Sequence, residues 1–188
     1  RRNRVVSFQS SFLARLTATG ATAHLDFIDA KGKKGVDLGI EAKMTREGTQ
    51  LHMTPLNPII AYRRFTLNED NYVELTREGR VLALVDLLAD DGTGLKLYST
   101  PNEDALQDIS LSLNNINMAE LTSVMPYAPQ LGGLLHGDLH YMQADSATTI
   151  STDIGIRRMT YEGTPMGDMG LNAIYFPNTD GSHHVDAV

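Results

Sequence analysis

Between residues 108 and 141 the sequence reads Asp108-Ile-Ser-Leu-Ser-Leu-Asn-Asn-Ile-Asn117, then Met118-Ala-Glu-Leu-Thr-Ser-Val-Met-Pro126 and, after a short linker, Leu131-Gly-Gly-Leu-Leu-His-Gly-Asp-Leu-His-Tyr141. The first and last parts alternate apolar and polar residues, as a strand with one buried face does. The middle part predicts a short helix, because Asn117 is a good N-cap, Glu120 follows three residues later as in a capping box, and Pro126 ends the pattern. The stretch contains no recognisable nucleophile, metal cluster or phosphate loop, which favours a protein that presents a surface over one that runs a reaction.

Composition excludes several classes of protein. The chain has 188 residues, 41% of them hydrophobic, which is too apolar for a disordered protein. Its formal net charge of −7 argues against a nucleic-acid partner, since phosphates are neutralised by a basic face. It has no cysteine, which excludes disulfides, and no apolar run long enough for a membrane-spanning helix. Because it starts on Arg1 without an initiating Met or signal peptide, we expect residues 1–188 to be a single fragment of a longer β-rich protein.

Alternation continues along most of the chain. Turn-forming segments such as Glu47-Gly48 and Asp90-Asp-Gly-Thr-Gly94 separate the alternating runs, and Asn57-Pro58 is expected to break one of them. So many short strands predict an all-β protein, arranged as a meander, a sandwich or a solenoid. The expected strands include 16–27, 36–44, 59–67, 72–75, 81–88, 95–98, 109–113, 139–142, 150–156, 159–161 and 171–176, and the one expected helix covers 118–125.

Two motifs resemble metal sites. His136, Asp138 and His140 would project from one face of a strand, and two imidazoles with a carboxylate can hold zinc or iron. A polar strand face is the simpler interpretation, because no further ligand accompanies them. Asp90-Asp-Gly-Thr-Gly94 resembles part of a calcium loop but lacks the closing Glu, so a hairpin turn accounts for it better. We therefore expect no catalytic residue, no metal site and no cofactor.

The apolar sides of the strands are the main functional candidate. They form either the sealed core of a β-sandwich or the open floor of a groove that takes acyl chains, and alternation alone does not distinguish the two. The lack of Trp and the presence of only five Phe weakly favour a groove. The candidate groove residues are Leu95, Leu97, Ile109, Leu111, Leu113, Leu139, Tyr141, Ile150, Ile154 and Ile156.

Several motifs between residues 57 and 188 carry a family resemblance. They are Phe65-Thr-Leu-Asn68, Asn71-Tyr-Val73, Leu113-Asn-Asn-Ile-Asn-Met-Ala-Glu-Leu-Thr-Ser-Val-Met-Pro126, Gly132-Gly-Leu-Leu-His-Gly-Asp-Leu139 and Met159-Thr-Tyr-Glu-Gly-Thr-Pro-Met-Gly167. In these motifs the chain resembles the TamB family (translocation and assembly module proteins) of the AsmA-like superfamily, in particular its Bacteroides-type members. The first 56 residues fit as generic strands.

The resemblance implies an elongated, curled antiparallel sheet, a taco-like groove with an apolar interior, in the periplasm of a Gram-negative bacterium. It implies a parent protein that is anchored in the inner membrane by parts outside this fragment and that moves phospholipids between the inner and outer membranes. The expected partners are phospholipid acyl chains and an outer-membrane β-barrel protein. The leading hypothesis is a non-enzymatic lipid conduit used in outer-membrane biogenesis. One alternative is an assembly module that binds partner strands at exposed sheet edges, and another is a closed sandwich with a structural role.

Overall fold

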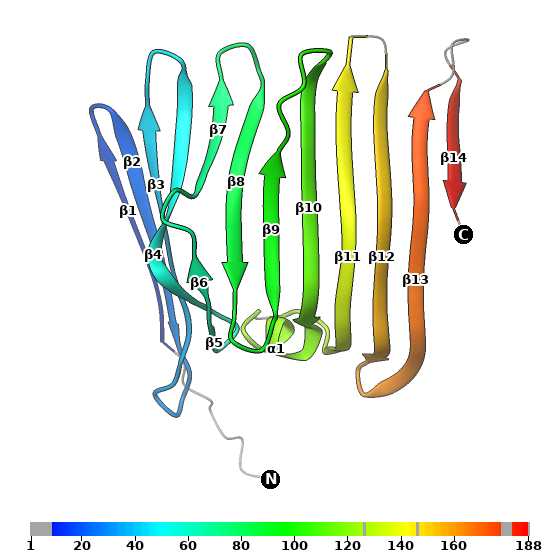
Figure 1. Cartoon of the computed structure of the whole chain (residues 1–188). Helices are drawn as coiled ribbons and strands as arrows, with labels where there is room; N and C mark the ends of the chain where they lie inside the picture. The colour runs from blue at the N-terminus through cyan, green and yellow to red at the C-terminus, as the bar shows by residue number, and fades with distance from the viewer. Residues whose placement is uncertain (1–8, 126, 146, 178–181, 188) are drawn as a thin grey trace.

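The computed structural model describes residues 9–125, 127–145, 147–177 and 182–187 and shows one antiparallel sheet with one short helix (Figure 1). Strands account for 72% of the chain, which confirms the expected all-β class. The strands are β1 (Gln9–Thr17), β2 (Gly20–Ile28), β3 (Lys34–Met44), β4 (Gly48–Ile60), β5 (Arg63–Arg64), β6 (Thr66–Leu67), β7 (Tyr72–Thr76), β8 (Val81–Leu88), β9 (Gly94–Ser99), β10 (Ala105–Asn117), β11 (Leu131–Ala144), β12 (Thr148–Tyr161), β13 (Thr164–Pro177) and β14 (His183–Ala187), and the helix is α1 (Met118–Ser123).

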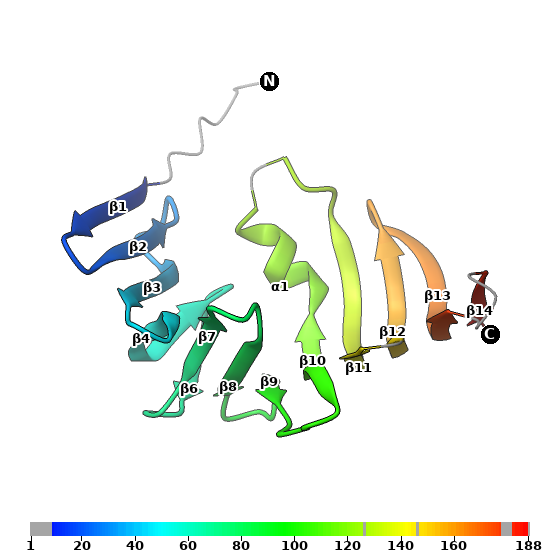
Figure 2. The ribbon, with the colours of Figure 1, turned by 90° about the horizontal axis from the view of Figure 1, so that it is seen from above.

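The sheet is a meander that curls into a trough. Its order is β1-β2-β3-β4-β7-β8-β9-β10-β11-β12-β13-β14, while β5 pairs with β4 and β6 with β8. Within the described part of the chain the sheet does not close on itself, because β1 pairs only with β2 and β14 only with β13. Seen from above, β1–β4 and β11–β14 form two walls, and α1 lies between them (Figure 2). The expected curled antiparallel sheet is therefore present, and the described strands do not form a sandwich.

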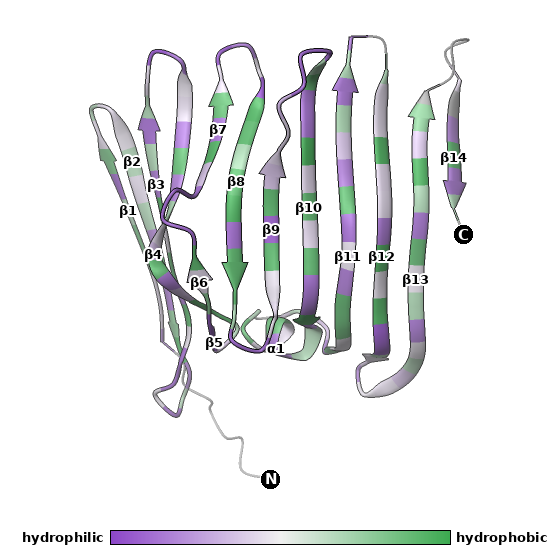
Figure 3. Ribbon diagram, in the orientation of Figure 1, coloured by the Kyte–Doolittle hydropathy of each residue, from purple (hydrophilic) through white to green (hydrophobic). Residues whose placement is uncertain are grey.

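The pairing register places apolar residues on one face of this sheet. In an antiparallel pair, directly opposite residues point to the same face. Leu111 lies opposite Leu97 on one side and Leu139 on the other. Apolar and polar bands alternate along these strands (Figure 3). The apolar face is the concave one, because Leu121 of α1, which lies inside the curve, lines a cavity together with Leu113.

The most buried apolar cluster lies in the middle of the sheet. It consists of Phe65, Leu67, Val85, Leu87 and Ala89, which come from β6, β8 and the residues next to them. Leu67 and Leu87 face each other across the β6–β8 pair, so the cluster is a feature of strand pairing. The floor of the trough is thus well packed at its centre.

Two asparagine side chains bridge an interruption between β6 and β7. Asn71 is 1% exposed; its Oδ1 accepts a hydrogen bond from the Met53 N–H at 2.7 Å, and its Nδ2 donates to the Met53 carbonyl at 3.2 Å. Asn68 binds β8 in the same way, through the Asp86 N–H at 2.9 Å and the Leu84 carbonyl at 3.3 Å. A side-chain amide offers the same donor and acceptor as a peptide group. The sheet therefore stays hydrogen-bonded from β4 to β8 where no strand residue fills the gap.

β-Bulges gather at the end of the sheet where α1 lies. Pairing slips by one residue between Leu113 and Ile116 in β10, and again between Ile156 and Met159 in β12. Asn115 adopts a φ of 49° inside the first slip, and Asn tolerates this left-handed conformation better than most residues. A bulge bends its strand and increases the local twist. The chain is bent in this way just before it leaves β10 for α1.

Two strand predictions are corrected by hairpin turns. Residues 16–27 do not form one strand, because Ala18 and Thr19 make the turn between β1 and β2. Residues 59–67 are likewise divided: Ala61 and Tyr62 have φ values of 51° and 65°, and Ile60 and Arg63 on either side of them pair. This is the geometry of a two-residue hairpin turn, which usually contains Asn or Gly. Because Ala61 and Tyr62 are neither, the sequence does not indicate this turn.

Two other expected boundaries are absent. Asn57-Pro58 does not break its strand, since β4 continues to Ile60 and the Pro58 carbonyl accepts a hydrogen bond from the Phe65 N–H. Proline removes only its own donor, so a strand can continue where that donor is not needed. The expected runs 150–156 and 159–161 join into β12, because the bulge between them interrupts the pairing without ending it.

The helix begins where it was predicted and ends earlier. The Asn117 side-chain oxygen accepts hydrogen bonds from the backbone N–H groups of Ala119 and Glu120, at 3.0 and 3.2 Å. α1 then ends at Ser123 instead of Met125. The predicted capping box is replaced by a tertiary contact, because the Glu120 carboxylate binds Arg63. Pro126, expected to end the helix, lies outside the described residues.

Candidate functional site

All ten residues predicted for a groove lie on the concave face. The register of β9 to β12 sets them in adjacent rows that run across the strands. Three rows consist of Leu97, Leu111 and Leu139; of Leu95 and Leu113; and of Ile109, Tyr141 and Ile150. The remaining two residues lie on β12, where Ile154 is opposite Gly137 and Ile156 is opposite Leu135 of β11. The common apolar face inferred from alternation is therefore present in the structure.

The same rows continue beyond the predicted residues in both directions. Leu25 and Leu38 face each other on β2 and β3, and Leu171 lies opposite Ile154 on β13. The alternation of these strands was visible in the sequence, but only the register shows that they extend the same surface. The apolar face thus spans the sheet from one wall of the trough to the other.

This surface is open to solvent. Leu25 is 42%, Ile40 41% and Leu171 49% exposed. A sealed sandwich would bury such side chains, whereas here they form a contiguous apolar surface that remains exposed. An open groove is therefore the interpretation that the geometry favours over a closed core.

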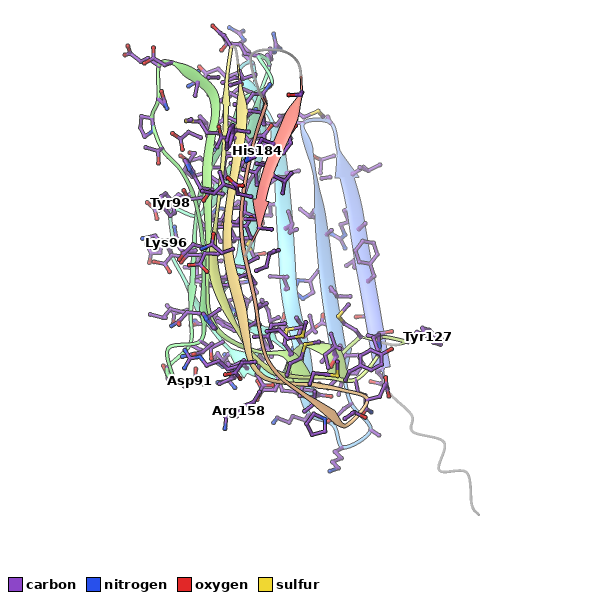
Figure 4. All side chains as sticks on the ribbon, turned by 90° about the vertical axis from the view of Figure 1, so that its right-hand side faces the viewer. Asp91, Lys96, Tyr98, Tyr127, Arg158 and His184 are labelled. Atoms are coloured by element: carbon purple, nitrogen blue, oxygen red, sulfur yellow. The ribbon has the colours of Figure 1, made fainter. Side chains whose placement is uncertain are left out.

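The convex face is polar. Lys96 and Tyr98 project from it, away from β1 and β2 (Figure 4), with the Lys96 ammonium 5.6 Å from the Tyr98 ring centroid. Next to them, the Ser112 hydroxyl donates to Asp138 at 2.6 Å. Asp153 of β12 lies opposite Asp138 in the strand register, on this same face. The two faces of the sheet therefore differ in chemistry as the alternation predicted.

The metal-like motif of β11 is divided among separate partners. The His140 ring lies 2.7 Å from Asp108, and this hydrogen bond lowers the pKa of the Asp108 carboxyl. Asp138 accepts from Ser112, and the His136 ring lies over Gly155, where it leaves no space for a side chain. The buried Nδ1 of His136 has no hydrogen-bond partner, but within the described residues the ligand atoms of His136, Asp138 and His140 do not lie close enough together to share one ion, so this motif does not form a ligand set.

A second charged cluster on the convex face was not predicted. His24 Nε2 lies 3.0 Å from Asp26 and 2.9 Å from Asp37, a grouping that depends on the β2–β3 register and so is invisible in the sequence. The ammonium of Lys34 lies 3.3 Å from Asp26 and 2.9 Å from Asp37 and lowers the pKa of Asp37. Lys34 thus occupies the place that a cation would take, and the cluster is an internal ion network.

The trough has a distinct apolar cavity of about 290 Å³ at its α1 end. Leu87, Leu95 and Leu113 contribute to its floor, and Leu121 of α1 contributes to its cover. Sequence reasoning included Leu95 and Leu113 but missed the cavity, because it forms only when α1 folds back over the sheet.

Arg63 fixes the cover of this cavity. Its guanidinium binds both carboxylate oxygens of Glu120, at 2.8 and 2.9 Å, and also contacts Asp91 in the β8–β9 turn. The hydrogen bond to Glu120 raises the pKa of Arg63. Asp91, in the segment that resembles a calcium loop, also accepts a hydrogen bond from the Thr93 N–H at 3.0 Å. The segment is the predicted hairpin turn, and it helps to hold α1 in place.

Comparison with known proteins identifies no relative. No protein-family model, curated protein or solved structure matches the chain. Within the described residues, no helix is long and apolar enough to cross a membrane. The resemblance to the TamB family therefore stays a prediction.

Proposed function

We propose that this chain is a non-enzymatic, groove-forming segment of a TamB-like envelope protein that shields phospholipid acyl chains between the inner and outer membranes. It would act in the periplasm of a Gram-negative bacterium, without a cofactor, and parts of the protein outside residues 1–188 would anchor it. The proposal combines the motif resemblance with the shape and chemistry of the trough.

One observation carries the proposal: an apolar face continues in register across a single open sheet, while the opposite face is polar. A lipid conduit needs such a surface and needs no reactive group. Keeping an acyl chain out of water is worth about 0.8 kcal/mol for each CH₂ group. Aliphatic side chains such as Leu111 and Leu139 would contact the acyl chains, and the open side of the trough would leave the headgroups in water (Figure 2).

Binding of a fluorescent fatty-acid probe tests the proposal. Leu111→Asp places a charge in the middle of the groove, and Ser112→Asp places the same charge on the convex face of the same strand, so the two variants form a matched pair. We expect Leu111→Asp to weaken binding at least tenfold, since a buried charge next to an acyl chain is unfavourable by more than about 1.4 kcal/mol. Ser112→Asp should bind like the unmodified protein. Equal binding by both variants, with circular dichroism showing both folded, would contradict the proposal.

The open edges of the sheet favour a second candidate function. The outer edge of β1 has no neighbouring strand in the described part of the chain, and Phe12 and Leu16 on this strand are 70% and 89% exposed. An unpaired edge can accept a further strand. The alternative is therefore an assembly module that pairs with strands of an outer-membrane β-barrel protein. Capture of strand peptides at β1, by a protein that does not bind the fatty-acid probe, would favour this alternative.

A further inference from the structure

The cavity under α1 differs from the rest of the trough because it has a cover. α1 lies inside the curve at one end of the sheet (Figure 2), and Leu121 of α1 lines the cavity together with the strand residues Leu95 and Leu113. Its volume of about 290 Å³ is just below the range of about 300–1,000 Å³ that is typical of small-molecule sites. A whole phospholipid does not fit, but part of one chain does.

The polar side chains around the cavity are already engaged. Arg63 and Glu120 bind each other, and the Asn117 side-chain oxygen caps α1. Thr93 is 5% exposed, and its hydroxyl donates to the Asn115 carbonyl at 3.3 Å. A buried polar group of a ligand would have to break one of these contacts, which makes its burial unfavourable. The part of a ligand that enters must therefore be aliphatic.

The cavity is continuous with the groove. Leu95 and Leu113 belong to the cavity lining, and Leu97 and Leu111 lie one step further along the same two strands on the same face. A chain that follows these residues towards α1 stays on apolar surface throughout. Its end, where no polar group remains, is the part that meets the cover.

We infer that this cavity binds the methyl end of one phospholipid acyl chain, while the remainder of that chain lies along the groove and the headgroup points away from α1. This assignment rests on the proposed function and adds a direction to it. The Arg63–Glu120 pair holds α1 over the end of the acyl chain. The groove is therefore closed to the acyl chain at the α1 end and open at the other end.

Quenching of single tryptophans tests the assignment, because the chain has no Trp of its own. Leu121→Trp and Ile116→Trp place the fluorophore in the cavity lining, Leu111→Trp places it in the open groove, and Ser112→Trp places it on the convex face. Ile116→Trp keeps the test valid if the substitution in α1 unfolds the helix. The probes are phosphatidylcholines that carry a nitroxide either near the methyl end of one chain or near the headgroup, presented with the protein in detergent below its critical micelle concentration.

The expected result is a several-fold larger loss of fluorescence from the cavity tryptophans with the methyl-end label than with the headgroup-end label. Trp at position 111 should be quenched by both labels, and Trp at position 112 by neither. Equal quenching of the cavity tryptophans by the two labels would overturn the assignment. Quenching at position 111 without quenching in the cavity would overturn it too, while the proposed groove would stand. No quenching at positions 111, 116 and 121 beyond that at position 112 would overturn both.

Discussion

Replacing Asn71 by alanine should destabilise the protein strongly. Its side chain joins β4 to the segment between β6 and β7 by three hydrogen bonds, two to the Met53 backbone and one to the Asn68 carbonyl at 2.9 Å. Asn71→Ala leaves the N–H and the carbonyl of Met53 without these partners and removes one of the two hydrogen bonds to the Asn68 carbonyl, at a position that is 1% exposed.

The expected magnitude follows from the number of bonds. A hydrogen bond contributes about 1 kcal/mol net, and a buried group left unpaired costs about 1–3 kcal/mol. Three lost bonds therefore predict a loss of about 3 kcal/mol in the free energy of unfolding. For a protein of this size such a loss lowers the melting temperature by about 6–12 °C.

Urea denaturation followed by far-UV circular dichroism measures this change. Asn114→Ala is the control, because the Asn114 side chain is exposed and its amide donates a hydrogen bond of the same type to the Gly92 carbonyl, at 2.8 Å. The effect of this control substitution should stay below about 1 kcal/mol. Asn71→Leu separates packing from hydrogen bonding, since it keeps the volume and removes the amide. The reasoning is refuted if Asn71→Ala unfolds within about 0.5 kcal/mol of the unmodified protein, or if Asn71→Leu restores full stability.

Three further outcomes are expected. Gly137→Ala should lower the free energy of unfolding by more than about 2 kcal/mol, because the new Cβ would lie 2.3 Å from a backbone oxygen of β12. Gly170→Ala is its control: the new Cβ would have no neighbour closer than 3.9 Å, so the same urea titration should show unchanged or higher stability. The hydrogen bond from His140 lowers the pKa of Asp108 in the folded protein, so this pair should stabilise the fold above a pH of about 4, and the stabilisation should be lost as the pH falls through the lowered pKa. In a plot of the free energy of unfolding against pH, Asp108→Asn should therefore reduce the fall in stability on the acid side, and an unchanged fall would contradict this. Arg63→Gln should speed amide exchange in α1 without changing it in β11 and β12, and equal rates in α1 of both proteins would show that the ion pair does not hold the helix.

The face pattern of the sheet could be predicted from the sequence, because alternation has the same period as the strand. Leu95, Leu97 and Leu111 were assigned to one surface on that basis alone, and the register places them there. The N-cap at Asn117 was also predictable, since an Asn before a helical run is a local signal. Structural features that depend only on neighbouring residues in the sequence could thus be predicted.

Features that depend on distant residues were not. The turn at Ala61 and Tyr62 lacks the usual Gly or Asn, and the contact between Arg63 and Glu120 joins residues 57 positions apart. Whether the apolar face is open or covered depends on how the whole sheet curls, which no local pattern encodes. For the same reason the cavity under Leu121 could not be predicted.

The central claim is that the concave face holds lipid in the cell. Photocrosslinking tests it directly, with a photoreactive amino acid at Leu111 in the groove or at Ser112 on the opposite face of the same strand, in the full-length protein in its own cell envelope. We expect phospholipid adducts at position 111 and none at position 112. Protein adducts at either position without lipid adducts, or no adduct at position 111, would contradict it.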